Sequence, residues 1–413
     1  MPLKILHTSD WHLGHSLRDW SREEEHRAFL AWLLACIVEE AVDVLVVAGD
    51  LFDTSNPSAA AQQLLYGFLG RLRAQHPRTR IVLVGGNHDS AARLDAAEPL
   101  LSALDIRMVG CLPYRGDGHG LADLDLERLL VPLPDVHGVV QAWIAAVPYL
   151  RPADFPDELS ALSMPEATAG LYTHLSAALQ QRGAAVRLAT GHCFVMGSDR
   201  SEGSERVLVG GAESLGADCF PPAFAYVALG HLHKPQVIDG RLYYSGAPLP
   251  FDLGEGDYKS RVLLIEVENG AIGGVRSLPL PRWTELLVLP AKTEAFSVDE
   301  VLAWAERQPS VGHTPPWRRP FLELRVEKVS RNLGLWNRLA GILKDRLPRL
   351  VKLTEVWGEG EVRSYEAGIQ LQDLLPMQVF EQRWRQRHGD EPLSPLLREA
   401  FSELLLAAQE AER

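Results

Sequence analysis

Carboxylate, imidazole and amide side chains occur in this chain in five short groups, and each group directly follows an apolar stretch. The residue types are those that bind divalent metals in mixed oxygen and nitrogen sites. Each group alone would be an ordinary turn or a surface pair. We interpret the five together as one site that the fold assembles from these side chains: Asp10 and His12; Asp50 and Asp53; Asn87, His88 and Asp89; His192; His231 and His233.

The chemistry that this combination predicts is hydrolysis of a phosphoester by a pair of divalent metals. Asp50 is our candidate for the carboxylate that bridges the two ions. Two metals about 3.5–4 Å apart stabilise the attacking and leaving oxygens of an in-line displacement at phosphorus. The glycines that flank the acidic and imidazole residues are expected to permit sharp turns close to the site.

The elements that must position these groups alternate between strands and helices. Uniformly apolar runs predict strands that are covered on both faces, and a helical repeat of apolar residues predicts the segments between them. We expect a helix through Phe29, Leu33 and Ile37, and helices over 58–74 and 91–104. Strands are expected at residues 3–6, 44–48, 81–84, 142–147, 186–190, 226–229, 242–244 and 262–267. The site groups then lie at the carboxyl ends of strands, where ligands bind in α/β sheets.

The predicted fold class is α/β: a layered β-sandwich core flanked by helices, a small α+β capping domain and a C-terminal helical hairpin. Prolines near residues 278–284 indicate a linker. We therefore divide the chain into 1–281, 282–370 and 371–413. The last segment has two apolar stripes at helical spacing, and these predict a hairpin that docks on its own domain or on another protein: Met377, Phe380 and Trp384; Leu397, Phe401 and Leu404.

The net charge of −13 over 413 residues does not favour binding to nucleic acid. One segment departs from this average, because residues 317–352 contain ten basic residues against three acidic ones. A face formed by some of them could follow a DNA backbone; an ordinary charged surface is the alternative. The basic residues are Arg318, Arg319, Arg325, Lys328, Arg331, Arg338, Lys344, Arg346, Arg349 and Lys352.

Two further features concern the cellular setting. No apolar run reaches the roughly 18 residues of a membrane span. The four cysteines lack paired motifs, which is typical of a reducing compartment. Both features predict a cytoplasmic protein without a membrane segment.

The order of the five groups resembles the calcineurin-like metallophosphoesterases, whose series reads D-x-H, GD-x-x-D, GNHD, GH and GH-x-H. The fuller strings HTSDWHLG, VAGDLFDTSNPS, GGNHDS and YVALGHLHKPQ resemble the nuclease subunits of bacterial SbcCD complexes. The resemblance covers about residues 1–265 and is only a general layout beyond them.

The resemblance implies a role for each of these side chains. Four residues would hold the first metal: Asp10, His12, Asp50 and His233. Four would hold the second, with Asp50 shared: Asp50, Asn87, His192 and His231. His88 would protonate the leaving sugar oxygen or stabilise the phosphorane, with Asp89 or a neighbour fixing its tautomer. Asp53 would be a supporting carboxylate of this catalytic group; archaeal and eukaryotic relatives carry histidine at its position.

The resemblance also implies cofactors and partners. The metals would be two Mn²⁺ ions, with Mg²⁺ as the alternative. The substrates would be double-stranded DNA ends and hairpins in DNA repair, recombination and replication on the nucleoid. A coiled-coil ATPase of the SbcC type would bind the tail. Helices 58–74 and 91–104 would form a homodimer within a heterotetramer, through apolar residues that also suit burial in one chain: Leu64, Leu65, Phe68, Leu94, Leu100 and Leu101.

Two other functions remain open at this point. A protein phosphatase or a cyclic-nucleotide phosphodiesterase would use the same metal pair, but neither needs a second domain and a tail. A non-catalytic scaffold would have lost a metal ligand or His88, and every one of these residues is present.

Overall fold

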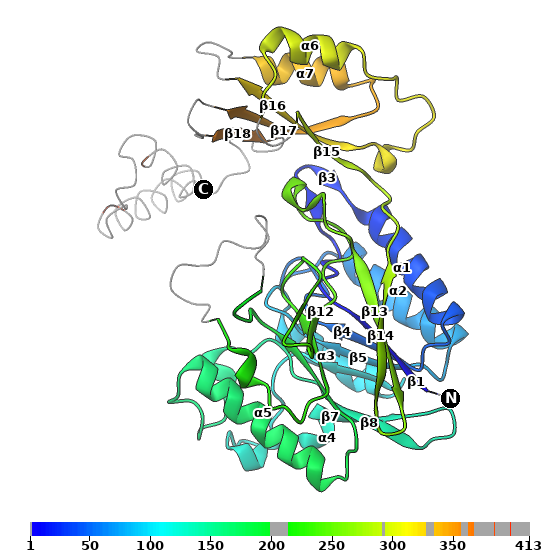
Figure 1. Ribbon diagram of the computed structural model, residues 1–413, viewed down its shortest axis with the longest axis vertical. Helices are drawn as coiled ribbons and strands as arrows, with labels where there is room; N and C mark the ends of the chain where they lie inside the picture. Colours follow the sequence, from blue (N-terminus) through cyan, green and yellow to red (C-terminus); the bar gives the residue numbers. More distant parts are fainter. Residues whose placement is uncertain are drawn as a thin grey trace, which may run out of the picture.

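The computed structural model describes residues 2–198, 214–290, 294–327, 334–356 and 362–366, and the single residues Trp384 and Leu397. Two six-stranded sheets form the core, and a four-stranded sheet lies beyond one end of it (Figure 1). The predicted layered α/β architecture is confirmed. The predicted helical hairpin at 371–413 lies outside the described residues, apart from Trp384 and Leu397, which are both helical.

The first sheet has the strand order β14-β13-β1-β4-β5-β6. Its strands β1, β4, β5 and β6 run parallel, and β13 pairs antiparallel with β1. Alternate residues of β4 face opposite sides, so Val46 joins the core between the sheets while Val47 packs beneath the helices. The strands are β1 (Leu3–Thr8), β4 (Val44–Ala48), β5 (Arg80–Val84), β6 (Ile106–Val109), β13 (Arg261–Glu268) and β14 (Ala271–Pro279).

Three helices cover the outer face of this sheet: α1 (Glu23–Glu39), α2 (Ala59–Gln75) and α3 (Ala91–Ser102). Helix α2 begins at Ala59, one residue after its predicted start, because Ser58 is its cap and the Ser58 hydroxyl accepts the Ala61 N–H at 3.2 Å. Trp11 is fully buried beneath the first site group, edge-on to the rings of Phe29 and Phe68.

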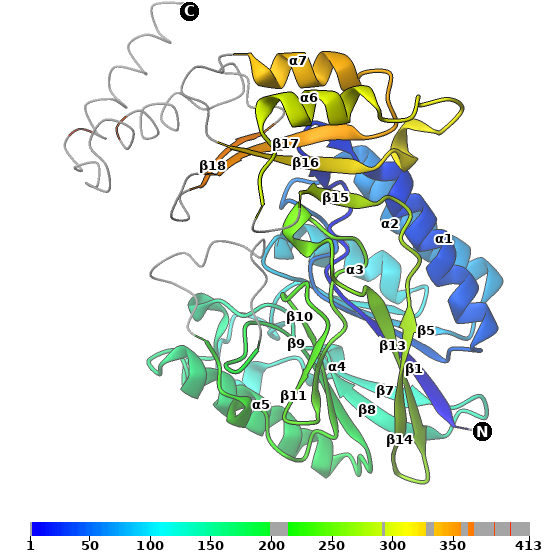
Figure 2. The ribbon, with the colours of Figure 1, turned by 45° about the horizontal axis from the view of Figure 1, so that its top comes forward.

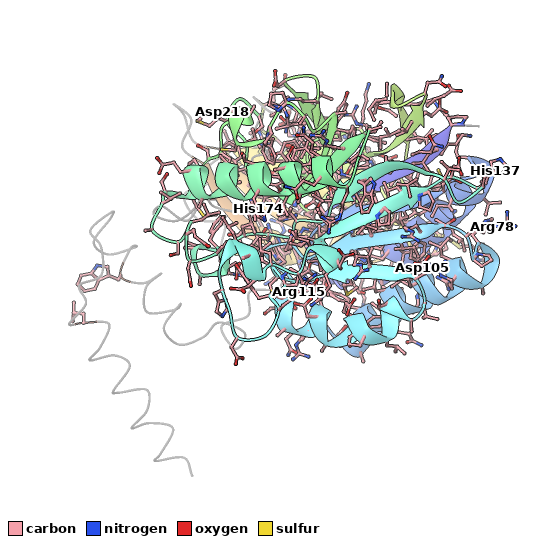
Figure 3. The ribbon with its side chains drawn as sticks, turned by 90° about the horizontal axis from the view of Figure 1, so that it is seen from below. Arg78, Asp105, Arg115, His137, His174 and Asp218 are labelled. Carbon is pink, nitrogen blue, oxygen red and sulfur yellow. The ribbon has the colours of Figure 1, made fainter. Side chains whose placement is uncertain are left out.

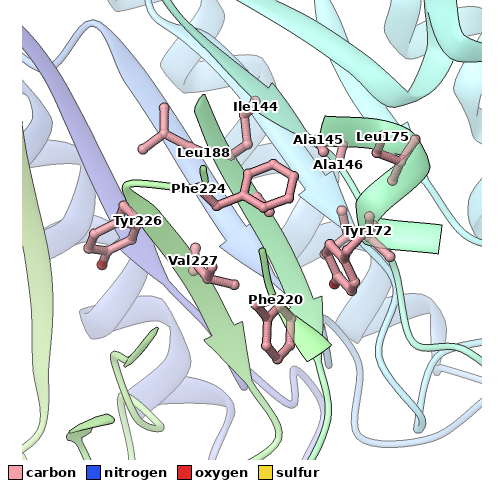
Figure 4. Close-up of a cluster of buried hydrophobic side chains, with 14 of the residues drawn as sticks. Ile144, Ala145, Ala146, Tyr172, Leu175, Leu188, Phe220, Phe224, Tyr226 and Val227 are labelled. Atoms are coloured by element: carbon pink, nitrogen blue, oxygen red, sulfur yellow. The ribbon is translucent and has the colours of Figure 1, made fainter. Parts of the chain in front are cut away.

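The second sheet has the order β11-β12-β10-β9-β8-β7. One continuous apolar core extends from the inner face of the first sheet through the second sheet to α5 (Met164–Gln181), and Figure 4 shows part of it. Figure 3, viewed from the end opposite the four-stranded sheet, shows α5 with its labelled His174 on one outer side. The strands are β7 (Leu130–Pro134), β8 (Val140–Ala145), β9 (Arg187–His192), β10 (Tyr226–Gly230), β11 (Gln236–Ile238) and β12 (Leu242–Tyr244), and the short helix α4 (Leu126–Leu129) precedes β7.

Helix α5 was absent from the predicted elements, although its sequence carries a start signal. Ser163 caps it, Pro165 lies in its first turn, and the Glu166 carboxylate accepts the Ser163 N–H at 3.1 Å. This is a capping box, the usual pattern at a helix start.

The four-stranded sheet has the order β15-β16-β17-β18, and a helix connects its neighbouring parallel strands β16 and β17 (Figure 2). Its apolar face packs on two helices. A hairpin of β2 (Ser16–Leu17) and β3 (Trp20–Ser21) reaches from the core to this sheet, where Leu17 contacts Phe321 and Val351. The elements are β15 (Leu286–Leu289), α6 (Val298–Glu306), β16 (Phe321–Glu327), α7 (Leu335–Leu343), β17 (Arg349–Val356) and β18 (Val362–Glu366).

Among the described residues, no helix has both the length and the apolar composition needed to cross a bilayer.

Candidate metal centre

The five groups of site residues follow five strands, and these strands belong to two different sheets. Strands β1, β4 and β5 lie in the first sheet, whereas β9 and β10 lie in the second. Strand β4 also contacts both β9 and β10 across the core. The carboxyl ends of all five therefore meet at one edge of the sandwich, and the site lies between the sheets.

Four candidate ligands adopt left-handed backbone conformations that residues other than glycine rarely take. The φ angles are 54° at Asp10, 43° at His12, 50° at Asp50 and 95° at His231. Backbone hydrogen bonds between the loops hold these conformations. The Asp10 N–H donates to the Gly49 carbonyl at 3.0 Å, and the His12 N–H donates to the backbone carbonyl of Asp50 at 3.0 Å. Such conformations persist only where the surroundings impose them, and they concentrate at functional sites.

Two glycines leave room for the neighbouring site residues. A Cβ atom on Gly86 would lie 2.1 Å from Oδ1 of Asp50, and a Cβ atom on Gly230 would lie 1.9 Å from the Ala48 carbonyl oxygen. Any side chain at either position would push the loops apart.

Asp50 lies at the centre of the cluster. Its Oδ2 is 3.4 Å from Nε2 of His12 and 3.2 Å from Nε2 of His192. Its Oδ1 accepts the backbone N–H of His88 at 2.9 Å. Burial alone would raise the pKa of Asp50, but the charges of His192 and His12 outweigh burial and hold it well below its usual value. The carboxylate is therefore ionised and stands between two imidazoles.

The amide oxygen of Asn87 organises the second half of the cluster. It lies 2.9 Å from Nε2 of His192 and 3.0 Å from Nδ1 of His231. On its other side, Nδ1 of His192 is 3.0 Å from the Ala48 carbonyl, so Nδ1 is the nitrogen that would keep its proton in a metal-bound ring and Nε2 the one that would offer a lone pair. Lone pairs of Asn87, His192 and Asp50 thus converge, which is the donor set of a cation site.

The first half contains Asp10, His12 and His233, whose ligand atoms lie within 4.8 Å of one another. His12 is buried, yet within the described part of the chain neither of its ring nitrogens makes a hydrogen bond. Its contacts with the carboxylates of Asp50 and Asp53, at 3.4 Å and 3.5 Å, are ion-pair distances and not hydrogen bonds, and a buried imidazole without a hydrogen bond is costly unless something binds it. The residues present therefore fit a divalent metal here, and the same holds for the group of Asp10, Asp50 and His192.

The predicted catalytic group consists of His88, Asp53 and Asp89, and each of the three makes different contacts. Nδ1 of His88 lies 2.8 Å from the backbone carbonyl of Asp53, and its ring centroid is 4.7 Å from that of His12. The Asp53 carboxylate lies 3.0 Å from Nδ1 of His15 and 3.5 Å from Nδ1 of His12. It therefore supports the imidazole of a candidate ligand.

The Asp89 carboxylate is occupied by backbone groups of two loops. Its two carboxylate oxygens accept the backbone N–H groups of Gly86, Leu51 and Phe52 at 2.9–3.0 Å. Burial and the nearby charge of Asp50 raise the pKa of Asp89 to about 6. Asp89 ties the loops after β4 and β5 together, and the Asp53 carbonyl, one of the neighbours that the prediction allowed, lies within hydrogen-bond distance of Nδ1 of His88.

Two residues of the site were missed by sequence reasoning. Glu255, fully buried, lies 2.9 Å from Nδ1 of His233. The ring of Phe251 lies 4.5–4.8 Å, centroid to centroid, from the rings of His12, His15 and His233. Neither residue belongs to one of the five groups, and an isolated Glu or Phe gives no local signal.

The basic segment 317–352 divides into residues that build the fold and residues that face solvent. The guanidinium groups of Arg319, Arg346 and Arg349 donate to backbone carbonyls of their own domain. Nε of Arg325 and Nζ of Lys352 each lie 3.5 Å from a carboxylate oxygen of Glu323. Lys328 and Arg331 are outside the described residues. Of the eight that the structure describes, three are exposed to solvent: Arg318, Arg338 and Lys344.

Comparison with known proteins identifies one family and several relatives. The family model of the calcineurin-like phosphoesterases matches residues 3–235. The chain is 44% identical over 335 residues to a Rhodobacter capsulatus protein named as the D component of the nuclease SbcCD, covering 78% of this chain and 80% of that one. Proteins with the same designation are 30% identical over 418 residues in Escherichia coli K12, covering 98% of each chain, and 31% identical over 318 residues in Bacillus subtilis, covering 74% of this chain.

Proposed function

The chain belongs to the calcineurin-like phosphoesterases and, within them, to the SbcD family of nucleases, and from this membership we propose that it hydrolyses DNA phosphodiesters with two bound metals as the nuclease subunit of an SbcCD-type complex. The observation that carries the proposal is the position of Asp50, whose Oδ2 faces both His12 and His192.

The chain's own residues have distinct tasks in this reaction. When bound, the metal pair stabilises the charge that develops on the attacking and leaving oxygens. Mn²⁺ is the metal that we propose, with Mg²⁺ as the alternative. Asp10, His12, Asp50 and His233 would hold the first ion. The second would be held by Asp50, Asn87, His192 and His231.

His88 would act as the general acid. Its Nδ1 is engaged by the Asp53 carbonyl at 2.8 Å, so Nε2 is the ring nitrogen that can deliver a proton to the leaving sugar oxygen. The hydrogen bond from the His88 backbone N–H to Asp50 keeps His88 next to the carboxylate that would bridge the metals.

We expect the purified chain with Mn²⁺ to shorten linear duplex DNA from its ends and to cut hairpins. The measurement uses end-labelled linear duplexes and hairpin oligonucleotides, with covalently closed circular DNA as the control. A chelator should abolish cleavage, and added Mn²⁺ should restore it. Release of phosphate from phosphopeptides or hydrolysis of cyclic nucleotides, with DNA left intact, would favour one of the alternative phosphoesterases.

A coiled-coil ATPase of the SbcC type is the proposed protein partner, and the tail 371–413 is the proposed attachment point. The relatives' name supports this assignment, because it describes one component of a larger nuclease, SbcCD. The DNA substrate would place the complex on the nucleoid in the bacterial cytoplasm.

We also propose a homodimer through α2 and α3. Of the six apolar residues considered from the sequence, five are at most 5% exposed within the chain, whereas Leu100 is 72% exposed. Leu104 and Tyr66 add further exposed apolar surface on or beside these helices, at 45% and 36%. The face that could pair is therefore centred on Leu100.

Leu100→Lys is expected to shift the chain from dimer to monomer, because pairing would bury the new charge without a partner. Light scattering after gel filtration measures the mass. Val38→Lys is the matched control, since Val38 is a helical residue with 45% exposure on α1 and should leave the mass unchanged. A Leu100→Lys protein that remains dimeric would show that another surface makes the dimer.

A further inference from the structure

Glu255 is a fully buried carboxylate that lies outside every metal-ligand motif of the chain. It ends a short 3₁₀ helix, Leu253–Glu255, in the loop before β13. A buried carboxylate is costly unless its oxygens are well paired. Both oxygens are paired here: Oε1 lies 2.9 Å from Nδ1 of His233, and Oε2 accepts the Phe251 N–H at 2.7 Å.

The contact with His233 determines which ring nitrogen faces the metal. Since Nδ1–H donates to Glu255, Nε2 is the nitrogen with a free lone pair. A carboxylate behind a ligating imidazole holds the ring in place and increases its basicity.

The contact with the Phe251 backbone extends the influence of Glu255 to a second ligand. The Phe251 ring lies 4.8 Å from the ring of His233 and 4.5 Å from that of His12. The Glu255 carboxylate therefore contacts the imidazole of His233 directly. It also binds the backbone of Phe251, whose ring packs against the imidazole of His12. Both imidazoles belong to the candidate set for the first metal, and neither belongs to the set for the second.

The loop that carries Glu255 is supported from the other side by the four-stranded sheet. Its 3₁₀ helix contacts β15 and β16, and Leu253 packs with Phe321 and Val351. The carboxylate thus lies between the first-metal imidazoles and the sheet that packs over them. A rigid support of this kind limits how far a ligand can move.

We propose that Glu255 is a positioning residue for the first metal: it fixes the orientation of His233 and the packing of His12, and it leaves the second metal site unaffected. This inference rests on the proposed two-metal function. Its distinguishing feature is selectivity, because a residue that merely supports the fold would weaken both metal sites or neither.

The test is titration of the full-length protein with Mn²⁺, followed by calorimetry. In the wild type we expect two sites. Glu255→Gln removes the charge and cannot accept from both partners, so it should retain one site at wild-type affinity and weaken the other about 10–100-fold. The Mn²⁺ concentration that half-saturates DNA cleavage should rise by a similar factor, and saturating Mn²⁺ should restore most of kcat.

Asp252→Asn is the matched control, since Asp252 lies in the same loop but accepts from Gly254 and pairs with Arg18. It should bind both ions as the wild type does. If Glu255→Gln binds both ions with unchanged affinity, or loses both equally, the inference is wrong. If the wild type binds no Mn²⁺, the proposed function itself fails. Should Glu255→Gln not fold, Glu255→Asp, which is one methylene too short to reach both partners, replaces it with the same outcomes.

Discussion

Asp50→Asn is expected to lower DNA cleavage by at least about a thousandfold, equivalent to ~4 kcal/mol of transition-state stabilisation. The reason is that one carboxylate serves both metal sets, with Oδ2 facing His12 and His192. Asparagine keeps an oxygen that can accept the His88 N–H, so the loop geometry should survive. It removes the negative charge that would hold two cations close together, and a metal pair contributes several kcal/mol to phosphoryl displacement.

The measurement pairs cleavage rates with the number of bound Mn²⁺ ions. Asp50→Asn should retain at most one ion under conditions in which the wild type holds two. Asp95→Asn is a suitable control, because Asp95 is a partly buried carboxylate that pairs with Arg128 away from the centre. Two retained ions together with near-normal cleavage in Asp50→Asn would rule out a bridging role for this residue.

His88→Gln is expected to lower kcat about 10²–10⁴-fold, the usual contribution of a general acid, while both metals stay bound. The backbone, not the ring, of His88 donates to Asp50, and its Nδ1 is occupied by the Asp53 carbonyl. Glutamine preserves the backbone contact but cannot deliver a proton. The loss should therefore appear in kcat and not in Mn²⁺ affinity.

A competing role is available to His88, because one of its ring nitrogens lies within 4.8 Å of potential ligand atoms of both His12 and Asp50. Loss of one Mn²⁺ from His88→Gln would identify it as a ligand instead of an acid. A substrate whose leaving group needs no proton, such as a nitrophenyl phosphodiester, separates the cases further: the general-acid role predicts that His88→Gln cleaves it almost normally. His137→Gln, at an exposed loop, serves as the control for both measurements.

Much of the fold could be predicted because its strands are short and uniformly apolar. Val44–Ala48 is buried on both faces as its composition predicts. Helix α2 begins at Ala59, one residue after the predicted start of the helix, with Ser58 as its cap. The prediction failed for α5, whose capping box was overlooked, and it did not anticipate that β16 and β17 are joined by β15 and β18 in one sheet. Partner strands cannot be identified from local periodicity.

The basic segment shows the same limit for electrostatics. Its composition indicated a face for DNA, but the fold uses Arg319, Arg346 and Arg349 to satisfy backbone carbonyls. Arg349 is also buried against the ring of Phe321, 3.8 Å from its centroid. The number of basic residues in a segment does not reveal which of them bond to the protein's own backbone and which face solvent, since both roles require the same residue type.

The sequence by itself determined which side chains gather at this centre. Each group of candidate ligands lies at the end of one strand or just after it, so its place there depends only on local backbone geometry. Tertiary structure decided the rest: that the five strand ends belong to two sheets, that the Asp89 carboxylate accepts backbone N–H groups of two loops, and that Glu255 lies behind His233. These are contacts between distant segments. They depend on how the sheets stack and how the loops are tied, which no short stretch of sequence encodes.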